Sequence, residues 1–77
     1  MTIRLNGEPY ELDDSISIAA LLERLGINPQ LVAVEYNQSV VKRARYGETI
    51  IEEGSEVEIV NFVGGGAGRR LRRIVQS

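Results

Sequence analysis

The chain of 77 residues contains no cysteine and no histidine. The absence of cysteine excludes disulfides and thiol nucleophiles, and the absence of both residues excludes zinc sites built from them. Histidine is also the commonest general base in enzymes. There is no phosphate-binding loop of the Gly-x-x-x-x-Gly-Lys type. We therefore expect no catalytic residue and no metal site, which argues against an independent enzyme.

Long apolar runs are absent as well. A membrane-spanning helix needs about 20 consecutive apolar residues, and no segment approaches that length. The first residues alternate between apolar and polar types instead of forming a signal peptide. We expect a cytoplasmic protein that has no membrane partner.

Charge divides the chain into two parts. Residues 1–66 hold five basic and all eleven acidic side chains, a net charge of −6, whereas residues 67–77 hold four arginines and no acid. Apolar residues make up 43% of the chain, which is ordinary for a folded domain. The sequence therefore predicts one small domain over residues 1–66, followed by a basic, disordered extension over residues 67–77.

The first 12 residues predict a β-hairpin. Apolar and polar residues alternate from Thr2 to Asn6, as in a half-buried strand. Asn6-Gly7 is a strong signal for a tight hairpin turn, because both residues tolerate positive φ. Pro9 has no backbone N–H, so the returning strand is expected at an edge of the sheet.

A helix is predicted over residues 17–25. Its apolar residues recur at helical spacing, and Ser17 is a good N-cap. Gly26 stands where a left-handed residue often ends a helix, and Pro29 prevents continuation.

The remaining apolar segments predict strands. Residues 31–34 form a short apolar run, residues 40–41 and 50–51 read as short strands, and residues 56–63 alternate again. Tyr46-Gly47 marks a turn between them. The three tyrosines are expected to be half-buried, with hydroxyl groups in water. The order of elements predicts an α+β fold with two layers, in which one main helix covers a mixed sheet of four to five strands.

The most unusual segment follows the last predicted strand, where Gly64, Gly65 and Gly66 come directly after Phe62 and Val63. Glycine has no Cβ atom, so such a segment is both flexible and thin. One interpretation is a plain linker to the tail. The other is a chain end that enters a narrow active site of another protein.

Residues 1–66 as a whole resemble the ubiquitin-like sulfur carriers of thiamine synthesis, the ThiS family, which have a β-grasp fold. The resemblance rests on Ile3-Arg4-Leu5-Asn6-Gly7-Glu8, Ile18-Ala19-Ala20-Leu21-Leu22 with Gly26, Val32-Ala33-Val34-Glu35-Tyr36-Asn37, Val41-Lys42-Arg43, and the segment from Glu56 to Gly66. Each segment is weakly specific alone, but their order and the glycine ending are characteristic.

The resemblance implies a protein substrate rather than an enzyme. In the family, the terminal glycine carboxylate is adenylated and then converted to a thiocarboxylate, which donates sulfur for the thiazole of thiamine. Carried over by position, Gly66 becomes the sulfur-carrying residue. Gly64 and Gly65 become the flexible tail that gives reach. For Phe62 and Val63 two interpretations stay open: a partner-binding base beside this tail, or two residues that complete the core. The chain itself is expected to bind no cofactor, since the activating enzyme uses the ATP and Mg.

The resemblance also implies partners: an E1-like adenylating enzyme, a thiazole synthase, and a sulfur donor such as a cysteine desulfurase. This sequence departs from the family because residues 67–77 follow Gly66. Gly66 then has a peptide carbonyl and no carboxylate, so the carrier hypothesis predicts cleavage after Gly66. Otherwise the chain is inactive, is a fragment of a fusion, or carries added residues.

Two alternatives remain open at this point. The small subunit of molybdopterin synthase has the same fold and terminal chemistry, although the Phe-Val-Gly-Gly-Gly ending is more similar to the thiamine carrier. The second alternative is a non-covalent ubiquitin-like adaptor, whose arginine tail binds an acidic protein or nucleic acid. Nucleic acid is not favoured, because the tail has no aromatic side chain to stack on bases.

Overall fold

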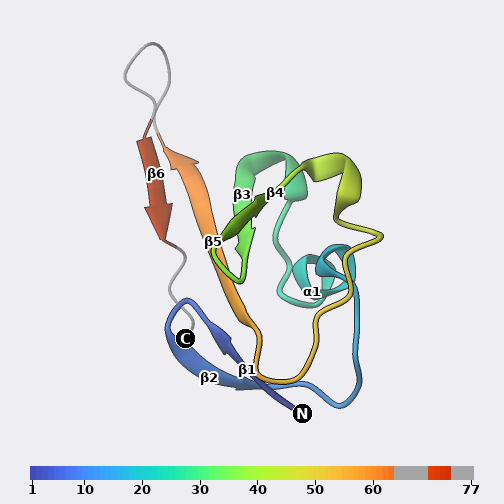
Figure 1. The fold of residues 1–77 in the computed structure, drawn as a ribbon. Coiled ribbons are helices and arrows are strands. Elements are labelled where there is room, and N and C mark those ends of the chain that lie inside the picture. Colours follow the sequence, from blue (N-terminus) through green and yellow to red (C-terminus); the bar gives the residue numbers. More distant parts are fainter. Residues whose placement is uncertain (64–69, 74–77) are drawn as a thin grey trace.

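The computed structural model describes residues 1–63 and 70–73. Its elements, in chain order, are β1 (Thr2–Leu5), β2 (Glu8–Glu11), α1 (Ile18–Arg24), a 3₁₀ turn η1 (Pro29–Leu31), β3 (Val32–Tyr36), β4 (Ser39–Val41), a 3₁₀ turn η2 (Arg43–Arg45), β5 (Glu56–Val63) and β6 (Arg70–Arg73). Figure 1 shows α1 on one side of the sheet, with β6 beside β5.

The sheet is mixed, as predicted. Its strands lie in the order β2-β1-β5-β3-β4, and β6 pairs with β5 outside this path. β1 pairs with β5 in parallel, whereas the other pairs are antiparallel. The two-layer α+β prediction is therefore confirmed. The longest strand, β5, lies at the centre of the five-stranded path.

The hairpin and the helix form where local chemistry predicts them. Asn6 and Gly7 both have positive φ, 52° and 85°, as a tight hairpin turn requires. The Ser17 side chain accepts a hydrogen bond from the Ala20 N–H, which caps α1. Gly26 has φ of 72°, and the Ile27 N–H donates to the Leu22 carbonyl, so the helix ends in a Schellman motif.

One hydrophobic core fills the space between α1 and the sheet. Its buried side chains come from β1, α1, β3, β5 and the segments between elements, whereas β2 and β4 contribute none: Ile3, Leu5, Leu12, Ile18, Leu21, Leu22, Val32, Val34, Tyr46, Ile51, Val57 and Ile59. Alternation places Val57 and Ile59 on the core side of β5, as the pattern predicts.

Three local predictions were wrong. Leu31, predicted as the first residue of a strand, ends η1 instead and is 56% exposed, because Pro29 and the Asn28 cap turn the chain before β3 begins. Residues 50–51 form no named strand, since Ile50 makes only an isolated bridge to Ser17. Tyr46 is 4% exposed and belongs to the core, not to the half-buried set.

The four residues of β6 also differ from expectation. The sequence predicts a disordered extension, whereas Arg70–Arg73 pair with Val60–Val63 of β5. The sequence around residues 70–73 does not reveal this pairing. An edge strand forms where a neighbouring strand offers unpaired backbone N–H and C=O groups, and that neighbour lies elsewhere in the sequence. The division of the chain after Gly66 lies outside the described residues and stays a prediction.

Candidate functional site

The predicted site lies at the C-terminal end of β5. Phe62 and Val63 are the last two residues of this strand, and their backbone is described. Gly64, Gly65 and Gly66 lie outside the described residues. The structure therefore describes the strand that precedes the glycines, and the roles of all five residues stay predictions.

Two neighbouring strands anchor β5. On one edge it pairs with β3 from Val57 to Asn61, and on the other with β1 at Glu56 and Val57. Val57 and Ile59 are at most 1% exposed. Burial of each such side chain stabilises a fold by about 1.5–3 kcal/mol. This part of β5 is therefore fixed in the domain, and it precedes the glycine segment in the chain.

Asn6 extends this anchoring beyond the end of β1. Its Oδ1 accepts the Ile59 N–H at 2.8 Å, and its Nδ2 donates to the Ile59 carbonyl at 3.3 Å. The side-chain amide thus makes both bonds that a neighbouring strand would make with Ile59. Sequence reasoning assigned Asn6 only to the hairpin turn, because nothing in the local sequence shows a contact with a residue 53 positions away.

The last residues of β5 extend past β3. The final pair between these strands is Val32 with Asn61, so Phe62 and Val63 have no partner in β3. In the described residues these two pair only with β6. The strand that leads to the glycines consequently runs past its last pair with β3, and Figure 1 shows β6 beside its end.

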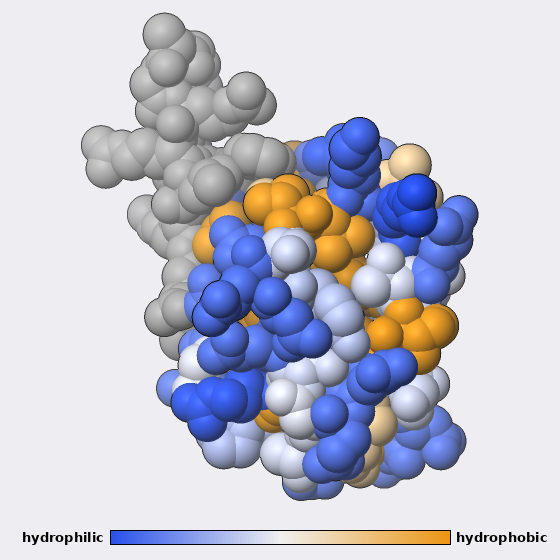
Figure 2. All heavy atoms as spheres, in the orientation of Figure 1, coloured by the Kyte–Doolittle hydropathy of each residue, from blue (hydrophilic) through white to orange (hydrophobic). Residues whose placement is uncertain are grey.

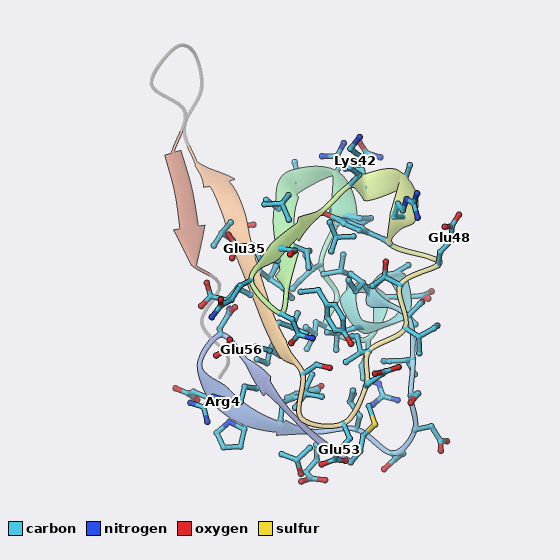
Figure 3. The ribbon with its side chains drawn as sticks, viewed as in Figure 1. Arg4, Glu35, Lys42, Glu48, Glu53 and Glu56 are labelled. Carbon is cyan, nitrogen blue, oxygen red and sulfur yellow. The ribbon has the colours of Figure 1, made fainter. Side chains whose placement is uncertain are left out.

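Carboxylates gather on the open face of the sheet beside β5. Glu35 of β3 stands directly opposite Glu58 of β5, with Glu56 on the same face. Together with Gln38, these residues line a hollow of about 210 Å³. Like charges opposite each other destabilise a strand pair, so this face favours a positively charged neighbour. Figure 3 shows Glu35 and Glu56 on the β5 side, far from Lys42 and Glu48.

Exposed apolar side chains are scattered by comparison. The large ones in the described residues are Leu31, Val40 and Ile50, on three different segments. Figure 2 shows polar and charged residues over most of the face in view, with separate apolar patches. The paired acids Asp13 and Asp14, and Glu52 and Glu53, are all exposed, as is the basic run from Lys42 to Arg45.

Tyr46 carries a phenol that is buried in the core. Burial raises the pKa of its phenol, and the nearby Arg43 guanidinium partly opposes this effect. The neutral hydroxyl donates to the Val32 carbonyl at 3.5 Å. It links the segment after η2 to the start of β3, so its role is structural.

Among the described residues, neither a carboxylate metal cluster nor a membrane-spanning helix is present. No group of three or more Asp or Glu side chains there could hold a metal ion. No helix in the same part of the chain is long and apolar enough to cross a membrane.

Comparison with known proteins covers the same region. The family model of the ThiS family matches residues 3–66. The chain is 34% identical over 65 residues to the sulfur carrier protein ThiS of Bacillus subtilis, covering 83% of this chain and 98% of that protein. It is 44% identical over 66 residues to a thiazole synthase of Magnetococcus marinus, covering 86% of this chain but only 20% of that protein.

A solved structure agrees with the fold. The crystal structure of the thiamine biosynthesis protein ThiS from Geobacter metallireducens superposes with a TM-score of 0.77 at 33% identity, covering 86% of this chain and all of that one. A family match over most of the chain and a near full-length relative above 30% identity together confirm the predicted resemblance. The chain belongs to the ThiS family of ubiquitin-like β-grasp sulfur carrier proteins of thiamine biosynthesis.

Proposed function

We propose that the chain, once residues 67–77 are removed, carries sulfur on the carboxyl group of Gly66 as a thiocarboxylate. The observation that carries this proposal is the position of the glycines. They directly follow β5, the strand that two neighbours and the core anchor most firmly. Three extended residues span about 10 Å, which is enough to carry a carboxyl group away from the domain and into a partner's active site.

The chemistry explains why an activating enzyme is needed. A terminal carboxyl group has a pKa of about 3.5, so at neutral pH it is an anion and a poor electrophile. Attack of the carboxylate on the α-phosphorus of ATP gives an acyl adenylate and releases pyrophosphate. A sulfur nucleophile then attacks the carbonyl carbon and expels AMP. Sulfide gives the thiocarboxylate directly, whereas the persulfide of a donor protein gives an acyl disulfide, whose S–S bond a second thiol reduces to release the thiocarboxylate and a disulfide. Glycine leaves the path of both attacks open, because it has no Cβ.

The proposed partners follow from this chemistry. An E1-like adenylating enzyme supplies ATP and Mg, a donor such as a cysteine desulfurase supplies sulfur, and a thiazole synthase consumes it. The chain matches about a fifth of the length of two proteins named thiazole synthase, which supports the last of these partners. Within this proposal the chain is a substrate and binds no cofactor itself.

The experiment is the intact mass of the protein from its native cells, with C-terminal fragment ions. We expect a chain that ends at Gly66 with one oxygen replaced by sulfur. The fragment ions are needed because oxidation of Met1 adds nearly the same mass. A chain that always ends at Ser77, even when thiamine is scarce, would contradict the proposal and favour a plain linker.

A second arm uses purified components. Chains ending at Gly66 and at Ser77 are mixed with an adenylating enzyme of the family, and exchange of labelled pyrophosphate into ATP is measured. Only the chain with a free Gly66 carboxylate should support exchange. Equal exchange with both chains would show that Gly66 is not the reacting residue.

A further inference from the structure

The edge of β5 that faces β1 has three successive neighbours. β1 pairs at Glu56 and Val57, the Asn6 side chain bonds to Ile59, and β6 pairs from Val60 to Val63. The same edge is therefore covered along its full length, first by the body of the domain and then by the tail.

The direction of the backbone groups shows what β6 covers. The Val57 carbonyl and the Ile59 N–H both point to this edge, since they bond to the Asn6 N–H and to Oδ1 of Asn6. Backbone groups of alternate residues in a strand share an edge, so those of Asn61 and Val63 point the same way. Their register partners are Arg72 and Arg70. Without β6 these groups would form an open strand edge.

Charge favours a basic residue at one position of this strand. Glu35, Glu56 and Glu58 lie on one face of the sheet. The register of β6 places Arg73 opposite Val60 on this same face, one pair beyond Glu58, whereas Arg70 and Arg72 lie on the other face. Opposite charges on neighbouring strands stabilise the pair, and like charges destabilise it. A strand with arginine or lysine at the position of Arg73 therefore fits this edge better than a strand with an acidic residue there.

We propose that β6 occupies, in the uncleaved chain, the edge on which a basic strand of a partner protein pairs after residues 67–77 have been removed. The proposal rests on the proposed function, which supplies both the cleavage and the partner. Strand addition of this kind uses main-chain hydrogen bonds for affinity and side chains for specificity. The uncleaved carrier is then closed to such a partner, and removal of the tail frees the Gly66 carboxylate and the docking edge in one step.

Hydrogen exchange of single amides measures occupation of the edge. In the full chain, the N–H groups of Asn61 and Val63 should exchange about tenfold or more slowly than in a chain ending at Gly66, because β6 protects them only when present. The Val60 N–H points to β3 and should be protected in both chains. Equal rates for Asn61 and Val63 in the two chains would overturn the proposal.

Two proline variants of equal charge give a matched pair. Arg72 faces Asn61, so Arg72→Pro removes an N–H that bonds to β5, whereas the N–H of Arg73 points away from it. We expect Arg72→Pro to give the fast exchange of the shortened chain and Arg73→Pro to keep the slow exchange. Equal behaviour of the two variants would contradict the assigned pairing.

The chemistry of the partner is tested with a peptide in trans. A peptide with the sequence of residues 67–77 is added to the chain ending at Gly66 at millimolar concentration, about what a short linker provides within one chain. It should slow exchange at Asn61 and Val63, and a peptide with glutamate in place of every arginine should not. Equal slowing by both peptides, or none by either, would refute a basic strand as the occupant.

The two proposals fail separately. If the shortened chain supports pyrophosphate exchange but the amide rates do not depend on β6, the carrier function stands and the occupied edge is wrong. If the amide rates behave as expected but the shortened chain is not adenylated, the strand pairing stands and the sulfur-carrier proposal is wrong.

Discussion

Replacement of Asn6 by glycine tests how β5 is held. Asn6 has φ of 52°, a conformation that glycine adopts without strain, so the variant removes the side chain and preserves the turn. It removes the two hydrogen bonds between the Asn6 amide and the Ile59 backbone. The Ile59 side chain is 1% exposed, so water reaches these backbone groups poorly.

Asn37→Gly is the matched control. Asn37 has φ of 50°, and its Oδ1 accepts the Glu56 N–H at 2.8 Å, at the other end of the same strand. Both variants increase the freedom of the unfolded chain equally, so that cost cancels in the comparison. Asn37 is exposed, and water can replace its single bond.

The expected difference follows from hydrogen-bond energies. A buried group left without a partner costs about 1–3 kcal/mol, whereas a typical exchangeable bond contributes about 0.5–1.5 kcal/mol. Asn6→Gly should therefore lower the free energy of unfolding by about 1–2 kcal/mol more than Asn37→Gly. In a domain of this size each kcal/mol lowers the Tm by roughly 4–8 °C.

Urea unfolding of the full chain and both variants, with thermal unfolding in parallel, measures this difference. The m-values should remain equal, so that the midpoints report stability alone. An Asn6→Gly variant as stable as Asn37→Gly would refute the argument that a side-chain amide serves as a strand neighbour for β5.

Three further predictions concern the cap, the core and the glycines. Ser17→Ala should lower the free energy of unfolding by about 1 kcal/mol, because it removes the cap of α1; Ser15→Ala, measured beside it by urea unfolding, should cost less. The pKa of Tyr46 is higher in the folded than in the unfolded chain, so the folded state retains the proton longer and stability should fall as pH rises above the unfolded pKa of about 10. Urea midpoints of Tyr46→Phe against pH should lack this contribution, and an identical alkaline profile would contradict it. Gly65→Ala in the chain ending at Gly66 should leave the Tm unchanged and reduce pyrophosphate exchange, whereas undiminished exchange would count against the steric role of the glycines.

Local chemistry explains which elements were predictable. Positive φ at Asn6 and Gly7, and the cap at Ser17, arise from residues within a few positions of each other. All residues that define the turn and the cap lie close together in the sequence. The hairpin and the helix were therefore predictable, and both form where expected. The error at Tyr46 has a tertiary cause, since the same side chain can face the core or water according to how the chain folds around it. The error at Leu31 is local, because the cap at Asn28 and the turn at Pro29 lie within three residues of it.

The sequence by itself determined the first hairpin, the main helix, the two-layer class, the ThiS resemblance and the position of the glycines after the last long strand. Only the tertiary structure decided that β5 lies at the centre, that β1 runs parallel to it, that Asn6 completes its edge, and that β6 pairs with it. Strand neighbours meet through backbone groups that every residue carries, so a pairing between distant segments leaves no mark in the local pattern. The pairing of distant strands is decided when the hydrophobic core forms, because only then do the segments that can pair with each edge of β5 lie beside it.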